Sequence, residues 1–321
     1  MSALRPLAAC AALIALTAPA AMAQDEAAPR TPWGVPDFSG VYSEYTPAPL
    51  ERPEEFGTRE FLTQEEFAAR EAQNIDQAIR NAGAAPGTEG DVHYDMESYA
   101  LTANEGVSSP NMRTSIVVTP ENGRIPPLLP QAVAREEARQ AARAGREFDG
   151  PEYRSFGERC IILTHQLPPI FVYGYNSNLQ IFQSPGQVLI QPEMGDPRII
   201  PTDGRPLPDD LLPQWNGTSV GRWEGDTLVI ETAGFRPETA WRGASEHIRV
   251  TERITRLDHD TLEYAFTVED PHTWAEPWGG VYPLTRMDNI LFEYACTEGN
   301  YGMRNTLAGQ RAAEREAARQ D

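Results

Sequence analysis

The sequence predicts a mainly β protein: an antiparallel, lipocalin-like barrel or a closely related sandwich, with N-terminal helices and long loops. Three observations predict this fold. From about residue 160 onward, short alternating apolar runs follow one another closely. Tight turns separate these runs, at Ser184-Pro185-Gly186, Gly225-Asp226 and Asp258-His259-Asp260. Long helical segments do not interrupt the series, which favours sequential hairpins over parallel βαβ units.

The two ends of the chain differ from this middle region. Residues 1–23 predict a secretory signal peptide that is cleaved near Ala23, because a charged start and a short apolar stretch precede a small-residue cleavage pattern. The apolar stretch is too short to span a membrane. We therefore expect a periplasmic or secreted protein. Residues 24–150 are expected to supply a leader, helices and a hairpin that pack on the barrel, 151–300 the antiparallel β core, and 301–321 a helical tail.

The N-terminal region contains two predicted helices and one predicted hairpin. Residues 62–82 are periodic in apolar side chains, and Thr63 with Glu66 has the spacing of a capping box. Residues 131–145 are rich in Ala, Glu and Arg, which favour helix. Residues 114–126 predict a β-hairpin with an Asn-Gly turn.

Alternation within the later strands indicates which side chains face inward. In 262–268 the even-numbered residues are apolar, and the same holds for the even-numbered residues of 290–296, which predict a final strand. In 246–256, three apolar residues share a face with Glu252. An acid at that position is paired with an arginine, caps a barrel end or is functional.

Two cysteines, Cys160 and Cys296, remain once the signal peptide is removed. In an oxidising compartment they most simply form a disulfide. A bond across so long a loop is expected to add about 3–5 kcal/mol of stability on the chain-entropy model. A cysteine nucleophile with a histidine partner is the weaker alternative in that compartment.

The composition excludes several function classes. The formal net charge is −20, so nucleic acids and anionic membrane surfaces are poor partners. The chain has no lysine, which excludes Schiff-base chemistry, a catalytic lysine and a Walker-type phosphate loop. All its fixed positive charges are arginines, which suit bidentate pairing with carboxylates.

Motifs for metals, nucleotides and serine nucleophiles are weak. The five histidines show no metal-binding spacing, and no G-x-G-x-x-G follows a strand, so we expect neither a metal nor a cofactor. Residues 217–221 match G-x-S-x-G by chance, because a hairpin follows them where a nucleophile elbow requires a helix.

General acid–base chemistry is the remaining possibility. Glu193 and Asp196 are the leading candidate catalytic acids, with Arg198 to position an anion or to tune their pKa values. His247 with Glu252 is the reserve pair. In each cluster the alternative is a structural arginine–acid pair.

Polar and aromatic residues near strand ends are candidates for ligand contacts, because ligands enter barrels at their mouths. Aromatic residues expected in these loops include Trp278 and Tyr282, and they either stack on a ligand or plug the barrel ends. The candidate substrate-binding residues are Tyr173, Tyr175, Asn178, Asp203, Arg205, Trp223, Asp270, His272 and Trp274.

Segments spread over most of the chain together resemble a large family of exported bacterial proteins. They are "WGVPDFSGVY" (33–42), "RTSIVVTPENGRIPPL" (113–128), "YNSNLQIFQSPGQVLIQPEM" (175–194), "GRWEGDTLVIET" (221–232) and "EYACTEGNY" (293–301). The resemblance implies the shared fold and export, and it implies no particular reaction.

This chain departs from the family pattern at one site. Other members often read E-M-x-H-D-x-R, and they often carry His after D-G-R-P. Here the chain reads "EMGDPR" and has Leu207 at the second position. The remaining pattern is matched by Glu193, Asp196, Arg198, Asp203 and Arg205. If the histidines are catalytic in other members, this protein has lost them or works differently.

The leading functional hypothesis is an exported, cofactor-independent enzyme that acts on a small, partly apolar, hydroxylated molecule. Lyase, isomerase or hydrolase chemistry fits its acid–base residues. The alternatives are a barrel that binds a small molecule without turnover and a structural envelope protein.

Overall fold

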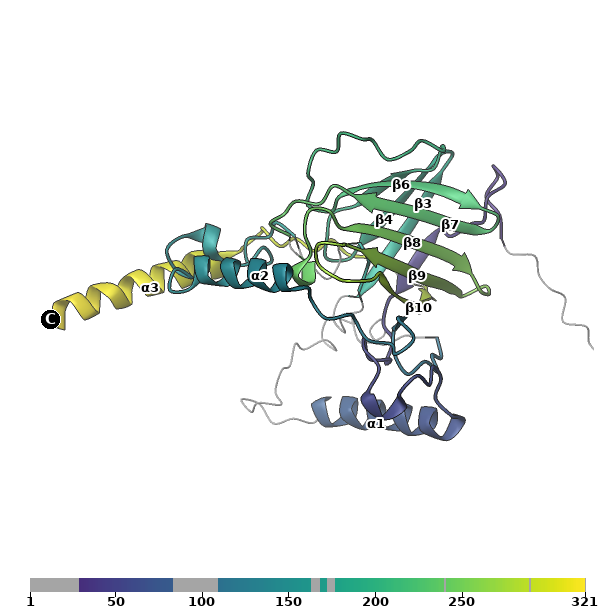
Figure 1. Cartoon of the computed structure of the whole chain (residues 1–321), viewed down its shortest axis with the longest axis horizontal. Coiled ribbons are helices and arrows are strands. Elements are labelled where there is room, and N and C mark those ends of the chain that lie inside the picture. Colours follow the sequence, from purple (N-terminus) through teal and green to yellow (C-terminus); the bar gives the residue numbers. More distant parts are fainter. Residues whose placement is uncertain are drawn as a thin grey trace, which may run out of the picture.

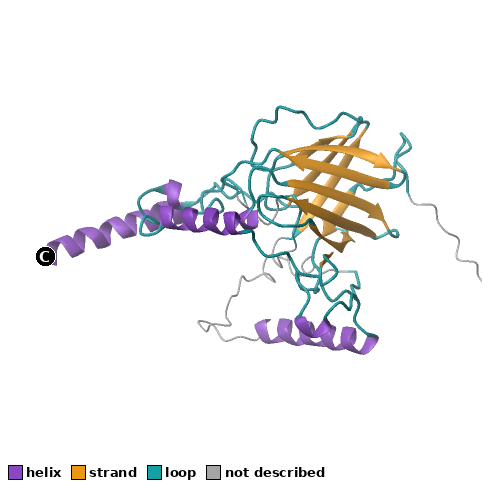
Figure 2. Ribbon diagram, in the orientation of Figure 1, coloured by secondary structure: helices purple, strands orange, loops and turns teal. Residues whose placement is uncertain are grey.

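The computed structural model of the chain describes residues 29–82, 109–162, 168–171, 177–239, 241–288 and 290–320. It is mainly β, as the sequence predicts: antiparallel strands form a nearly closed barrel with helices outside it (Figures 1 and 2). The strands are β1 (Gly40–Ser43), β2 (Val117–Thr119), β3 (Asn178–Ser184), β4 (Gln187–Pro192), β5 (Arg198–Pro201), β6 (Thr218–Glu224), β7 (Thr227–Ala233), β8 (Arg249–Arg256), β9 (Thr261–Glu269) and β10 (Trp278–Met287).

The hydrogen-bonded order around the barrel is β5-β4-β3-β1-β10-β9-β8-β7-β6, and β2 pairs additionally with β10. The hairpins β3–β4, β6–β7 and β8–β9 are those that the turn residues predict. β1 lies between β3 and β10, so the barrel includes a strand from well before residue 150.

The barrel closes where its two end strands, β5 and β6, meet without ladder hydrogen bonds. Gly221 of β6 makes this approach possible. A Cβ added there would lie 3.0 Å from the Cγ2 atoms of both Ile200 and Thr202. A side chain on this residue would therefore push the two strands apart.

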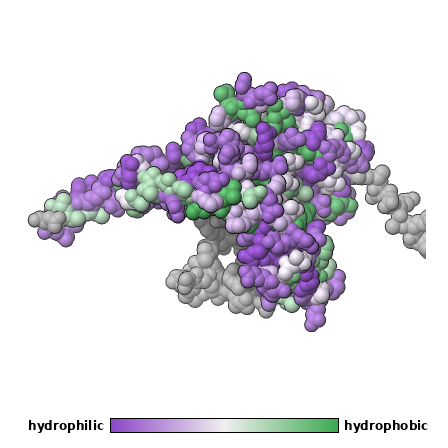
Figure 3. Space-filling view, viewed as in Figure 1, coloured by the Kyte–Doolittle hydropathy of each residue, from purple (hydrophilic) through white to green (hydrophobic). Residues whose placement is uncertain are grey.

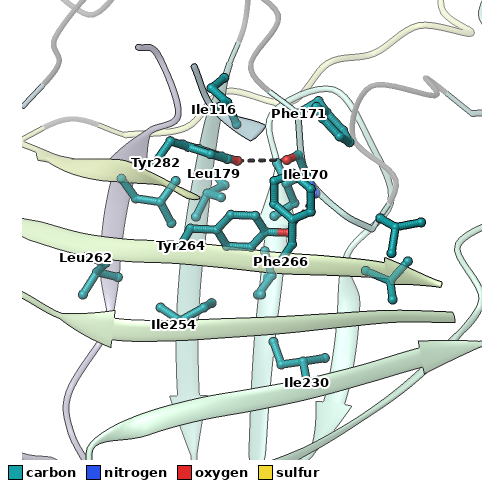
Figure 4. Close-up of a cluster of buried hydrophobic side chains, with 14 of the residues drawn as sticks. Ile116, Ile170, Phe171, Leu179, Ile230, Ile254, Leu262, Tyr264, Phe266 and Tyr282 are labelled. Atoms are coloured by element: carbon teal, nitrogen blue, oxygen red, sulfur yellow. Dashed lines mark hydrogen bonds between the residues drawn. The ribbon is translucent and has the colours of Figure 1, made fainter. Parts of the chain in front are cut away.

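Inward-facing side chains fill the barrel as the alternation of β9 predicts. Leu262, Tyr264, Phe266 and Val268 are all buried. Tyr264 pairs with Tyr282 of β10 in the ladder, and Leu262 pairs with Leu284. Figure 4 shows Tyr264 and Phe266 of this set pointing into the core above residues of β7 and β8. The core therefore occupies the inside of the barrel.

The prediction that residues 290–296 form the closing strand is wrong. Ile290, Phe292 and Tyr294 are 68%, 59% and 41% exposed, and the segment has no strand geometry. The strand that follows β9 is β10, whose Trp278 and Tyr282 are buried core residues and not loop aromatics.

Gly279 and Gly280 explain why the apolar alternation of the sequence does not predict β10. A Cβ at Gly279 would lie 2.3 Å from the Phe266 carbonyl oxygen, and one at Gly280 would lie 2.8 Å from that of Ile116. Close packing of β9 and β2 on β10 requires glycine at both positions, and glycines interrupt the apolar alternation.

The predicted hairpin at residues 114–126 is also wrong. Only β2 forms there, and it pairs with β10 and not with a second strand of its own. The chain turns after a cis Thr119–Pro120 bond, with the Gly123 N–H donated to the Pro120 carbonyl. Pro126 and Pro127 have no N–H to donate, so the following residues cannot continue a ladder.

Three α-helices lie in the described part of the chain: α1 (Gln64–Ala82), α2 (Pro130–Arg143) and α3 (Tyr301–Gln320). The capping box of α1 is confirmed, because Glu66 N donates to Thr63 Oγ1 at 3.2 Å and Thr63 N donates to Glu66 Oε2 at 2.8 Å. Hydrophilic residues cover much of the face shown in Figure 3, including that around α1. None of the helices within the described residues combines the length and apolar character that crossing a membrane requires.

The predicted disulfide is confirmed. Cys160 and Cys296 are bonded, with their Cα atoms 5.6 Å apart. The bond ties the segment that follows β10 to the segment that precedes β3. Asn300 adds a second link, because its Nδ2 donates to the Glu158 carbonyl at 3.1 Å.

Candidate functional site

A buried ion pair lies inside the barrel. Arg198 of β5 forms two hydrogen bonds with Glu252 of β8, at 3.0 and 2.5 Å, and both side chains are almost completely buried. The same guanidinium lies 3.2 Å from Ser219 Oγ of β6 and 3.4 Å from Thr232 Oγ1 of β7. The sequence left three alternatives for Glu252: an arginine partner, a cap at a barrel end, or a functional role. In the structure Glu252 pairs with an arginine.

Two tyrosines connect this ion pair to a segment that fills the barrel. Tyr264 Oη donates to Glu252 Oε1 at 2.7 Å and accepts the Ile170 N–H at 2.9 Å. Tyr282 Oη donates to the Ile170 carbonyl at 3.0 Å (Figure 4). Ile170 is 1% exposed, so its peptide groups and side chain occupy the space between the two tyrosines. Side chains of the described residues fill the interior of the barrel.

Aromatic side chains pack beside Ile170. Trp278 stacks on Trp241 with ring centroids 5.6 Å apart, and Trp274 meets it edge-on at the same distance. Phe171 contacts Trp241 at 4.8 Å. Trp274 is only 2% exposed, so it is placed as part of a core plug. Trp223 is only partly buried and packs against the core at Phe38, with ring centroids 5.3 Å apart.

A pocket of about 470 Å³ lies on the outer side of the barrel wall, over β3 and β4. Phe182 lines it from β3, where outward residues alternate with the buried Leu179 and Ile181. The segment that ends at Cys296 forms the opposite side. Both cysteines of the disulfide line the pocket, so the covalent bond holds the two sides together. We call this site the outer-wall pocket.

The outer-wall pocket contains two of the predicted catalytic acids, Glu193 and Asp196. The third predicted member, Arg198, does not join them. β5 begins at Arg198, and the alternation of this strand turns the side chain into the barrel, where Glu252 binds it. The charged stretch 193–198 is thus divided between the two faces of the barrel wall.

The environment of Glu193 favours its protonated form. Burial raises its pKa, and a hydrogen bond from Asn178 Nδ2 to Oε2, at 2.7 Å, opposes this shift only in part. Asn178 was predicted to bind substrate, and its side chain instead donates to the catalytic candidate Glu193. A carboxyl group with a raised pKa inside a pocket is suited to general acid–base work.

Glu44 is another acid with a raised pKa, and it was not among the site residues predicted from the sequence. Both its carboxyl oxygens are buried, and no described residue forms a hydrogen bond with them. Burial, together with repulsion by Glu193, raises its pKa to about 8. Its backbone N–H bonds to Ser177 and that of Glu193 bonds to Asn178, so adjacent residues of one segment anchor both acids. The alternation of β1 offered a signal, because Glu44 has the inward parity of Tyr42.

The reserve pair of His247 and Glu252 does not exist. Glu252 is sealed in the barrel, whereas the His247 side chain is 57% exposed and stacks on His272 with centroids 4.5 Å apart. Asp270 supports this corner: Ser245, His272 and Thr273 donate to its carboxylate. Burial opposes its ionisation, but these hydrogen bonds prevail and hold its pKa below the usual value.

Asp203 and Arg205, which were also predicted to bind substrate, do not line the outer-wall pocket. Asp203 and Arg205 pair with each other at 2.5 Å on the surface, and the hydrogen bond from Arg205 lowers the pKa of Asp203 to about 2. Tyr173 and Tyr175 lie outside the described residues. Among the residues that the structure describes, no group of three or more His, Cys, Asp or Glu side chains is arranged to hold a metal ion.

Comparison of the chain with protein-family models, with curated proteins and with solved structures finds no match. The functional argument therefore rests on the geometry of the outer-wall pocket.

Proposed function

We propose that the protein is an exported enzyme that performs acid–base chemistry, without a cofactor, on a small, partly apolar, hydroxylated molecule. The observation that carries the proposal is the position of Glu193: half-buried, with a raised pKa, and lining a pocket of about 470 Å³. Pockets of this size hold small ligands. A carboxyl group whose pKa approaches the working pH can both donate and accept a proton.

The pocket assigns different roles to its residues. Glu193 is the proposed general acid or base, and Asn178 is a positioning residue that fixes the orientation of its carboxyl group through Oε2. Asp196 is the second carboxyl group of the pocket. Phe182, Leu291 and Phe292 supply apolar walls for the body of the substrate. Proton transfer of this kind serves lyase, isomerase or hydrolase reactions, and Arg198 takes no part in it.

Export is part of the proposal. Residues 1–23 have the pattern of a signal peptide, and the resemblance to a family of exported bacterial proteins agrees with it. A disulfide that borders the pocket is compatible with an oxidising compartment.

A screen of periplasmic metabolites followed by substitution tests the proposal. The variants are Glu193→Gln and Asp196→Asn, made singly and together. Glu193→Gln is expected to lower turnover by at least about 100-fold, which is the scale of lost acid–base catalysis. Asp203→Asn is the matched control, because Asp203 is an acid of the same stretch that pairs with Arg205 outside the pocket. Full activity in the folded double variant removes the proposal.

A second candidate is a structural envelope protein, and one observation favours it: the interior of the barrel is filled by Ile170 and its aromatic neighbours. A structural protein needs no ligand in the outer-wall pocket. Absence of turnover and of any small-molecule binding would favour this candidate over the enzyme.

A further inference from the structure

We propose that the outer-wall pocket binds a small organic cation, an amine with an apolar body. This inference rests on the proposed function, because it names the substrate class of the same site. It joins three observations: the charge of the pocket lining, repulsion between Glu193 and the buried acid Glu44, and the aromatic rings around the pocket.

The described lining of the pocket is acidic and includes no base. Glu193, Asp196 and Glu293 line the pocket, and no arginine or histidine is found among its described lining residues. No ion pair within the described part of the chain involves any of the three, although arginines pair with acids over much of the surface. The nearest arginine along the chain, Arg198, is buried on the other side of the wall and neutralised by Glu252.

Glu44 does not line the pocket, but it repels Glu193 when both carboxyl groups are ionised. Among the residues that the structure describes, its two oxygens have no hydrogen-bond partner, which is costly for a buried carboxyl group. Repulsion between Glu44 and Glu193 contributes to the raised pKa of Glu44, so each carboxyl group is within electrostatic range of the other. A cation bound beside Glu193 relieves this repulsion, and an anion increases it.

Aromatic and apolar side chains suit the remainder of such a ligand. Phe182, Phe292 and Tyr294 line the same pocket as the three acids. Aromatic ring faces attract ammonium groups, most strongly where water is excluded. Met194 and Leu291 extend the apolar wall. Carboxylates next to aromatic rings therefore favour an amine over a neutral alcohol of the same shape, and exclude a carboxylate.

Three probes of one shape test the charge preference: 2-phenylethylammonium, 2-phenylethanol and phenylacetate, titrated calorimetrically into the full mature chain at pH 7. We expect the ammonium to bind at least about tenfold more tightly than the alcohol, and phenylacetate not to bind. Glu193→Gln and Asp196→Asn should each weaken binding of the ammonium several-fold and leave binding of the alcohol unchanged. Asp203→Asn should change neither.

Equal or tighter binding of the alcohol or the carboxylate overturns the inference, as does failure of the ammonium to bind at millimolar concentration. The outcomes also separate the inference from the proposed function. Selective ammonium binding with full turnover in Glu193→Gln rejects acid–base catalysis and keeps the cation site. Turnover of a neutral or anionic substrate that is lost in Glu193→Gln keeps the enzyme and rejects the cation site.

Discussion

Arg198 and Glu252 form a bidentate ion pair across the interior of the barrel, with Nη1 to Oε1 at 3.0 Å and Nη2 to Oε2 at 2.5 Å. The pair joins β5 to β8, and Arg198 also donates to Ser219 of β6 and Thr232 of β7. The Arg198 side chain therefore links four strands around the junction of β5 and β6. Because β5 and β6 share no ladder hydrogen bonds, this buried pair helps to hold the barrel closed.

Breaking this pair from one side is expected to be costly. Arg198→Met leaves the Glu252 carboxylate buried without its counter-charge, and should lower the free energy of unfolding by about 3–5 kcal/mol. The double variant Arg198→Met, Glu252→Leu should recover much of that loss, since no charge is then buried. Urea unfolding followed by circular dichroism measures both. Arg205→Met, which breaks an exposed pair, is the control and should leave stability unchanged.

The two tyrosines that hold Ile170 should differ in importance. Tyr264→Phe leaves both the Ile170 N–H and one Glu252 oxygen short of a hydrogen bond, whereas Tyr282→Phe affects only the Ile170 carbonyl. We expect losses of about 2–4 kcal/mol for Tyr264→Phe and about 1–2 kcal/mol for Tyr282→Phe. The same unfolding experiment ranks them. A Tyr282→Phe variant less stable than Tyr264→Phe would contradict the arrangement.

Glu44 should make the protein less stable as the pH rises. Its pKa in the folded chain is about 8, above its ordinary value of 4.5, so the unfolded chain releases the proton first. Its contribution is complete below about pH 4.5 and is lost as the pH rises to 8. Between pH 5 and pH 8, wild type should lose about 3 kcal/mol of unfolding free energy relative to Glu44→Gln. Parallel curves for the two proteins would show that Glu44 titrates normally.

The disulfide should support the outer-wall pocket more than the barrel. Cys160→Ser with Cys296→Ser removes a bond that closes a loop of 136 residues, and the chain-entropy model assigns such a bond about 5 kcal/mol. The 290–296 segment belongs to no strand ladder, so the far-ultraviolet circular dichroism spectrum should persist while ligand binding disappears. Retention of binding by the double serine variant would show that the pocket walls stay in place without the bond.

The sequence predicts the barrel well where alternation and turn residues coincide. The inward faces of β8 and β9 are read correctly because a strand side chain has only two directions, and a buried face selects one. The capping box of α1 is a local pattern, and the disulfide follows from the two cysteines that remain after the signal peptide, although they are 136 residues apart. The prediction fails at β10, because the packing that requires Gly279 and Gly280 depends on Phe266 and Ile116, which are distant in sequence.

The candidate site is predictable in part for the same reason. Glu193 and Asp196 are identified by their density of charge, and they do share a pocket. The residue Arg198, two positions beyond Asp196, faces the opposite side of the wall because β5 starts there. Its partner Glu252 is 54 residues away in the sequence, so no local pattern predicts that the two residues pair. The pocket wall formed by residues 290–296 is linked by a covalent bond to Cys160. Its apolar residues alternate as in a core strand, which is why the sequence predicts a strand there.

The location of a bound ligand tests the central claim most directly. A methyl-selective NMR titration with 2-phenylethylammonium reports on both candidate regions at once. The account predicts shifts at methyl groups that line the outer-wall pocket, those of Ile162, Met194 and Leu291, and none at Ile230 and Ile254 inside the barrel. Shifts at Ile230 and Ile254 without shifts at the pocket methyl groups would contradict it and move the binding site into the barrel interior.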